Sequence, residues 1–196
     1  YSVRYTGASV VGLPKSMFKS AQGYSHIKFE DWLLNKGSRQ LNEFLDKVVL
    51  PLTYQYYINL KEPDEKMLIL CSTTKMCEYY QKYLQREFKN LKINVYISGS
   101  PDEILKESDI IVSTTGSAGT GRDIKRLRFC LNTISMRSEP TNEQVLGRLR
   151  ELRYSEVPPV YAYTHWAIIP SHCDHAQARE QLYVPLGKTF SNISYN

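Results

Sequence analysis

Two short runs of residues have the composition of phosphate-binding segments. Residues 113–123 are rich in hydroxyls and glycine, and they follow the apolar run 110–112. Glycine lets the backbone approach a phosphate, so that backbone N–H groups can hold it. In the second run, Gln144 and Arg148 lie four positions apart, on one face of a predicted helix. A guanidinium on that face is suited to contact a triphosphate.

The order of residues in these runs separates several nucleotide-binding motifs. Gly116 and Gly121 have P-loop spacing, but Arg122 and Asp123 follow where Lys and Ser or Thr are required. The Rossmann glycine pattern is also absent. The order Thr115, Gly121, Asp123, followed by Q-x-x-G-R from Gln144, instead resembles motifs V and VI of superfamily 2 helicases. In that family both motifs belong to the second RecA-like domain.

The resemblance extends to both sides of these motifs. Residues 66–74 form an apolar run that ends in Ser72, Thr73 and Thr74, and they resemble motif IV. The three motifs come in the family's order and cover roughly residues 60–155. The flanks, with Gly23-Tyr24 and 29–32 before and 169–172 after, most resemble phage-encoded helicases of this superfamily.

The resemblance implies a role for each matching residue. In these helicases ATP binds between two RecA-like domains, and the first carries the P-loop lysine and the acidic magnesium motif, neither of which is found in this chain. Arg148 matches the arginine finger, and Gln144 matches a residue close to the nucleotide. Gly121 and Asp123 match the end of motif V, which joins the nucleotide site to the nucleic-acid groove. The residues that match contacts to the nucleic-acid strand are Ser72, Thr73, Thr74, Thr114 and Thr115.

Motif VI departs from the family pattern at its second arginine. That position holds Glu151, whereas Arg150 stands one residue earlier and Arg153 two residues later. One residue turns a helical side chain by roughly 100°. Arg150 therefore serves as the second finger only if the local backbone differs from that of the family.

Composition and charge indicate one globular domain. The chain has 196 residues and a formal net charge of +5, which favours anionic partners only mildly. Its four cysteines are scattered, as is usual in a reducing compartment. There is no apolar run of about 20 residues that could span a bilayer. We expect a cytoplasmic protein, in the host cytoplasm if it is phage-encoded. The expected domain is 1–196, with 1–60 as a helical lead-in and 156–196 as a C-terminal extension.

The pattern of apolar residues predicts alternating strands and helices. Such alternation indicates a RecA-like α/β fold, whose mainly parallel sheet has helices on both faces. Ligands gather at the carboxyl ends of the strands in such a sheet, where we expect residues 72–74 and 114–123. The expected strands are 67–71, 93–97, 110–113, 129–134 and 160–167. The expected helices are 38–59, interrupted at Pro51, then 76–91, 101–107, 141–152, opened by a capping box of Thr141 and Gln144, and 171–182.

Each feature also has a purely structural interpretation. Ser72 to Thr74 could simply cap the helix that follows, and Arg148 and Arg150 could face solvent. The glycines of 116–121 could form a plain turn. The basic residues Arg122, Lys125, Arg126 and Arg128 fit either a nucleic-acid contact or a solvated edge. His165, His172, Cys173 and His175 lack the spacing of a structural zinc site, so we expect no metal site and treat Arg179 beside them as an ordinary helix charge.

These observations predict the C-terminal motor domain of an ATP-dependent helicase or translocase. Its expected partners are nucleic acid, DNA rather than RNA, and the N-terminal RecA-like domain of the same protein, with no membrane. That first domain would make most of the contacts to ATP and Mg²⁺, so the isolated chain is expected to hydrolyse no ATP. The alternative is a non-enzymatic nucleic-acid-binding or regulatory module on a RecA-like fold. The missing lysine and serine of the P-loop disfavour a complete small nucleotide-binding enzyme.

Overall fold

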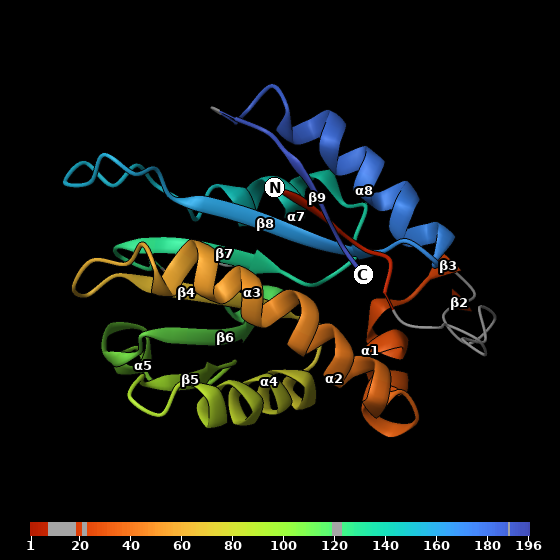
Figure 1. The fold of residues 1–196 in the computed structure, drawn as a ribbon, viewed down its shortest axis with the longest axis horizontal. Helices are drawn as coiled ribbons and strands as arrows, with labels where there is room; N and C mark the ends of the chain where they lie inside the picture. The colour runs from red at the N-terminus through yellow and green to blue at the C-terminus, as the bar shows by residue number, and fades with distance from the viewer. Residues whose placement is uncertain (8–18, 21–22, 119–122, 188) are drawn as a thin grey trace.

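A parallel sheet of seven strands forms the centre of the molecule (Figure 1). The computed structural model describes residues 1–7, 19–20, 23–118, 123–187 and 189–196. The strand order is β5-β6-β4-β7-β8-β1-β9, and each neighbouring pair is parallel. The strands are β1 (Ser2–Tyr5), β4 (Lys66–Cys71), β5 (Ile93–Tyr96), β6 (Ile110–Thr114), β7 (Leu127–Asn132), β8 (Val160–Trp166) and β9 (Asn192–Tyr195). A separate two-stranded sheet pairs β2 (Lys19–Ser20) with β3 (Gly23–Tyr24).

The central strands are apolar on both sides because helices cover both faces of the sheet. In β4, Met67 and Ile69 belong to one buried cluster, whereas Leu68 and Leu70 belong to the other. Side chains of a strand alternate between faces, so a continuous apolar run is what a doubly covered parallel strand requires. The predicted α/β fold with a parallel sheet is thereby confirmed.

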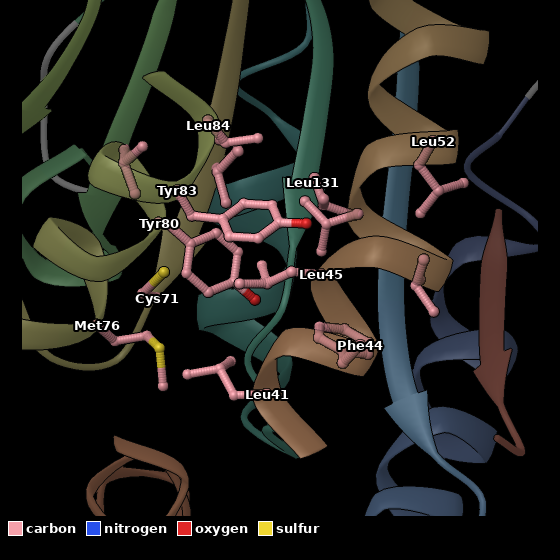
Figure 2. Close-up of a cluster of buried hydrophobic side chains, with 14 of the residues drawn as sticks. Leu41, Phe44, Leu45, Leu52, Cys71, Met76, Tyr80, Tyr83, Leu84 and Leu131 are labelled. Carbon is pink, nitrogen blue, oxygen red and sulfur yellow. The ribbon is translucent and has the colours of Figure 1, made fainter. Parts of the chain in front are cut away.

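The first face is covered by the N-terminal helices and by the helix that follows β4. These are α1 (His26–Asn35), α2 (Ser38–Phe44), α3 (Leu50–Thr53) and α4 (Thr74–Glu87), with the π-helical segments η2 (Leu45–Val49) and η3 (Tyr54–Ile58). Figure 2 shows Leu41 and Leu45 from this layer beside Met76 and Tyr80 of α4. All four side chains are almost fully buried. The 3.6-residue periodicity of both segments therefore corresponds to one continuous apolar interface.

Pro51 does not interrupt the long N-terminal helix, contrary to the prediction. The backbone stays helical from Ser38 to Ile58, with π-helical segments on either side of α3. Pro51 is the second residue of α3, which directly follows η2. Proline removes one hydrogen bond from a helix interior, and π-type turns are the irregularity that a longer α-helix most often contains at such a point.

The second face is covered by α5 (Glu103–Glu107), α6 (Thr115–Ala118), α7 (Glu139–Leu146) and α8 (Pro170–Tyr183). Val145 of α7 and Ala176 of α8 pack there with Leu70, Cys130 and Tyr163 from the strands. No helix within the described ranges is long and apolar enough to cross a membrane.

Helix α7 is shorter than predicted and begins earlier. It starts at Glu139, with Pro140 in its first turn, and it ends at Leu146 rather than at 152. Ser138 stands at the N-cap position, and its Oγ lies 2.8 Å from Thr141 Oγ1. Thr141 is therefore inside the helix, and the predicted capping box is wrong. Proline is favoured in the first turn of a helix, and glycine, here Gly147, favours its end.

The ends of the chain contribute strands that the sequence pattern did not predict. β1 lies between β8 and β9, so residues from both termini complete one half of the sheet. The lead-in 1–60 is thus helical from His26 onward but also supplies β1, and the extension 156–196 supplies β8, α8 and β9. β7 covers Leu127–Asn132, two residues earlier at each end than expected.

Candidate functional site

The hydroxyl-bearing turns after β4 and β6 lie at the same edge of the sheet. The two strands are parallel neighbours, and Cys71 is paired with Thr114 in their register. The residues that follow, Ser72 and Thr115, therefore leave the sheet side by side at its carboxyl edge. The predicted convergence of these two turns is confirmed, although their contact with a ligand stays a prediction.

The turn between β4 and α4 is occupied by a buried carboxylate that the sequence analysis missed. Thr73 is the N-cap of α4, and its Oγ1 accepts from the N–H of Met76 at 3.2 Å. Glu30 of α1, only 2% exposed, accepts from the N–H of Ser72 at 2.6 Å and from Thr73 Oγ1 at 2.8 Å. Thr74, the first residue of α4, is exposed. Ser72 and Thr73 thus already hold an anionic group from within the chain.

A chain of buried polar side chains extends from Glu30 across the same edge. His26 Nε2 lies 3.6 Å from Glu30 Oε1, and His26 Nδ1 accepts from the N–H of Ser135, which follows β7, at 3.2 Å. The Tyr24 hydroxyl lies 2.8 Å from His26 Nδ1 and also contacts His172 Nε2. Burial, aided by the charge of Arg179, lowers the pKa of His26 to about 3. Helix α1 therefore covers the carboxyl ends of β4 and β7 with a hydrogen-bonded network in which His26 is uncharged.

His165, His172 and Arg179 of the C-terminal part are buried. His172 is 1% exposed, and the Cys173 thiol donates to Ala167 O at 3.3 Å. No group of three or more His, Cys, Asp or Glu that could hold a metal occurs in the part of the chain that the structure describes. Arg179 is also buried and donates to the carbonyls of Ile134 and Met136, so it is not an ordinary surface charge.

The turn after β6 is more open than the turn after β4. The Thr114 hydroxyl donates to Ser117 Oγ at 2.9 Å, and Thr115 begins the short helix α6. Thr115 is partly exposed and Gly116 is exposed. Gly121 and Arg122, which the sequence analysis assigned to this loop, lie outside the described residues.

Two of the predicted nucleotide-binding residues, Asp123 and Arg148, lie elsewhere with Arg150, around a hollow beside the amino end of β7. Its volume is about 290 Å³, and the lining includes Asp123, Arg148 and Arg150. Asp123 therefore does not lie with Thr114 at the carboxyl edge, because the chain has already crossed toward the start of the next strand. The other charged groups that line the hollow are Lys125, Arg126, Glu151 and Arg153. Cationic side chains outnumber acidic ones there, which suits a polyanion.

Arg148 and Arg150 differ in their exposure, and neither lies in α7, although the predicted helix 141–152 contained both. Arg148 follows the end of α7 in a turn, where its N–H donates to Val145 O at 3.2 Å. The Nε atom of Arg148 is buried. Burial raises the pKa of the Cys130 thiol, and the positive charge of Arg148 opposes that rise. Arg150 is 76% exposed and its Nε lies 3.8 Å from Asp123 Oδ1. Gln144 is exposed on α7, so the expected shared helical face of Gln144 and Arg148 is not formed.

The basic residues near the start of β7 also differ from the expectation of a common surface. Arg128 is fully buried and bound to Glu65 at the amino end of β4, so it cannot contact a nucleic-acid backbone. Arg126 donates to Pro63 O at 2.9 Å and lies over the ring of Tyr154, 4.0 Å from its centroid. Lys125 is exposed.

The buried Glu30 makes a pH-dependent contribution to stability. Burial raises the pKa of Glu30 from 4.5 to about 7, against the opposing effect of its hydrogen bonds from Ser72 and Thr73. The folded state thus binds this proton more tightly than the unfolded chain. The contribution is complete below pH 4.5 and is lost as the pH rises through about 7. We therefore compare the free energies of unfolding of the wild type and of Glu30→Gln. The difference in favour of the wild type should fall by up to about 3 kcal/mol as the pH rises over that window. Urea unfolding at several pH values measures it, and parallel curves for the two proteins would contradict it.

Comparison with known proteins adds a fold and a partial sequence match. No family model matches the chain. Over 96 residues it is 35% identical to the ATP-dependent RNA helicase-like protein DB10 of Nicotiana sylvestris, a match that covers 44% of this chain and 16% of that protein. The matched stretch is therefore a small part of that relative.

Solved helicase domains have a similar fold. Domain 2 of the DEAD-box helicase Mss116p, bound to an RNA duplex, superposes with a TM-score of 0.52 at 15% identity, over 100% of this chain and 63% of that one. The C-terminal domain of a variant of S. cerevisiae Dbp5, bound to Gle1 and IP6, superposes with a TM-score of 0.52 at 13% identity, over 74% and 80% of the two chains. This chain therefore has the RecA-like α/β fold found in the second domain of helicases.

Proposed function

We propose that this chain is the second RecA-like motor domain of an ATP-dependent nucleic-acid helicase or translocase. The observation that carries the proposal is the meeting of Asp123 with Arg148 and Arg150 at one cationic hollow. These residues come from two separate segments that resemble motifs V and VI. The RecA-like fold and the paired hydroxyl turns at the opposite edge support the same assignment.

In this proposal the chain contributes cationic groups to a nucleotide held mainly by another domain. Arg148, with its Nε buried, is held more firmly than Arg150 and is the better candidate for the arginine finger. A guanidinium there stabilises negative charge that develops on the transferring phosphoryl group. Asp123, which lines the same hollow, would lie toward the same nucleotide. Magnesium does not fit the hollow, because Asp123 is paired with Arg150 and cationic groups predominate.

The strand-binding part of the proposal rests on the open turn after β6. Thr115 and the exposed Gly116 leave the sheet where hydroxyl and N–H groups can reach a sugar-phosphate backbone. Glu30 binds the N–H of Ser72 and the hydroxyl of Thr73, and Thr74 is the exposed residue of the neighbouring turn. As the two domains close on ATP and open after hydrolysis, the contacts to the nucleic-acid strand would alternate between them.

Thr115→Val tests this assignment in the full-length protein. Removal of one hydroxyl that contacts phosphate should weaken the binding of a nucleic-acid strand about fivefold, and equally for different nucleotide sequences. It should also reduce the stimulation of ATPase activity by single-stranded nucleic acid. Salt titrations of binding to DNA and to RNA of the same sequence measure the affinity, and we expect the tighter binding with DNA. Thr189→Val, an exposed threonine in the C-terminal segment, is the matched control.

Three outcomes would contradict the proposal. Unchanged binding and unchanged stimulation in Thr115→Val would mean that these hydroxyls only cap helices. ATP hydrolysis by the isolated chain would contradict the assignment of the P-loop and magnesium ligands to another domain. Strand binding by a full-length protein that has no ATPase activity would favour a non-enzymatic binding module.

A further inference from the structure

The segment that carries Arg148 and Arg150 has no regular secondary structure. It runs from the end of α7 at Leu146 to the start of β8 at Val160. On one side it lines the cationic hollow, and on the other it lines a second hollow of about 360 Å³. A segment between two hollows lacks close packing on both sides, so its position depends on a few specific contacts.

Directly beside this segment lies a buried ion pair between Glu65 and Arg128. Both side chains are 0% exposed. Arg128 Nη2 donates to Glu65 Oε1 at 2.5 Å, and Arg128 Nε donates to Glu65 Oε2 at 2.7 Å. Glu65 directly precedes β4 and Arg128 belongs to β7, so the pair is fixed to two central strands of the sheet.

The remaining polar atoms of the pair bind the segment itself. Arg128 Nη1 donates to Val157 O at 2.5 Å, and Arg128 Nη2 donates to Ser155 Oγ at 2.9 Å. The Tyr154 hydroxyl donates to Glu65 Oε1 at 2.9 Å. The Arg126 guanidinium lies over the Tyr154 ring. Three residues of the segment, Tyr154, Ser155 and Val157, are thus bound to one ion pair.

Stability alone is a weak reason for such a pair. Desolvation offsets most of the attraction between buried charges, and an apolar pair of similar volume is often as stable. An apolar pair could not, however, bind a carbonyl, a hydroxyl and a phenol at fixed angles. The contacts of Arg128 and Glu65 therefore specify the place of the segment more than they stabilise the sheet.

We propose that Glu65 and Arg128 are positioning residues for the arginines of this segment. Through Tyr154, Ser155 and Val157 they hold the far end of the segment, while the last turn of α7 holds its start. Arg148 and Arg150 lie between these two anchors. This inference rests on the proposed function, because it assigns the ion pair to the geometry of the arginine finger.

Tyr154→Phe tests the inference with little risk to folding, because it removes one hydroxyl from a partly exposed ring. In the full-length protein we expect kcat for ATP to fall about tenfold with KM unchanged, since displacement of a catalytic group by 1 Å can cost up to about 100-fold. Amide hydrogen exchange should become faster in residues 148–157. Tyr79→Phe is the matched control, because it removes the same kind of hydroxyl bond, to Asn42 at 2.7 Å, on the opposite face of the sheet.

The outcomes separate this inference from the proposed function. If Arg148→Ala abolishes turnover in the same assay but Tyr154→Phe leaves kcat unchanged, the inference is wrong and the proposed function stands. If exchange in 148–157 is unchanged, the ion pair does not hold the segment and the inference is wrong whatever Arg148 does. If Arg148→Ala keeps its turnover, the proposed function fails first. Faster exchange together with reduced kcat in Tyr154→Phe, but not in Tyr79→Phe, supports the inference.

Discussion

Replacement of Arg148 by alanine should lower the ATP turnover of the full-length protein by about 10³-fold or more. The guanidinium would neutralise charge that builds up only in the transition state, so kcat falls steeply. The affinity for nucleic acid should be kept, because Thr115 and Thr74 lie at the opposite edge of the sheet from the hollow of Arg148. Steady-state ATPase assays and strand-binding titrations on the same preparation measure both quantities.

Arg153→Ala is the matched control for this prediction. Arg153 lines the same hollow but is exposed, and it should retain most of the activity. Arg148→Lys should behave almost as poorly as Arg148→Ala, since an ammonium cannot reproduce the planar, bidentate contact of a guanidinium. Near-normal turnover in Arg148→Ala would make Arg148 a structural arginine and its resemblance to motif VI a coincidence.

Glu65→Ala should lower the free energy of unfolding by about 3–5 kcal/mol. The reason is that Arg128 would remain buried and charged with no carboxylate partner. When both partners are exchanged, as Glu65→Leu with Arg128→Met, the free energy of unfolding should fall much less than in the single variant. Chemical unfolding of the three proteins measures the difference, and equal losses in the single and double variants would contradict the prediction.

The same ion pair predicts a specific acid sensitivity. Burial alone would raise the pKa of Glu65, but hydrogen bonds from Arg128, from the Glu62 N–H and from Tyr154 lower it below its ordinary value of 4.5. A lowered folded-state pKa stabilises the fold above the unfolded value, and this stability is lost as the pH falls through the folded value. Below pH 4.5 the wild type should therefore lose stability faster than the double variant.

The sequence predicted the central elements well because their signals are local. The apolar runs at 67–71, 110–113 and 160–167 correspond to β4, β6 and β8, since a buried parallel strand must be apolar on both sides. The edge shared by the turns at Ser72 and Thr115 follows from parallel pairing alone. The strands β1 and β9 were missed because each has four residues and its partners are distant in sequence.

Errors at the candidate site arose where tertiary contacts override local patterns. Arg128 was grouped with surface basic residues, yet it stands within the apolar run of β7, and that position is a signal of a buried arginine. Glu30 gave no such signal, because the groups that it binds lie 42 and 43 positions away. Residues 147–152 were extended from α7 by periodicity, although Gly147 follows its last turn and the chain leaves the helix there.

The place of β1 between β8 and β9 also determines the order in which the sheet can assemble during synthesis. The amino group of Tyr1 binds the carbonyl of Tyr161, 160 positions later, and Thr6 binds Tyr195, 189 positions later. At about 5–20 residues per second, a ribosome needs roughly ten seconds or more to deliver those partners. Until then Val3 and Tyr5, buried in the finished fold, have no strand to join. The half of the sheet that contains β1 is therefore the last to form.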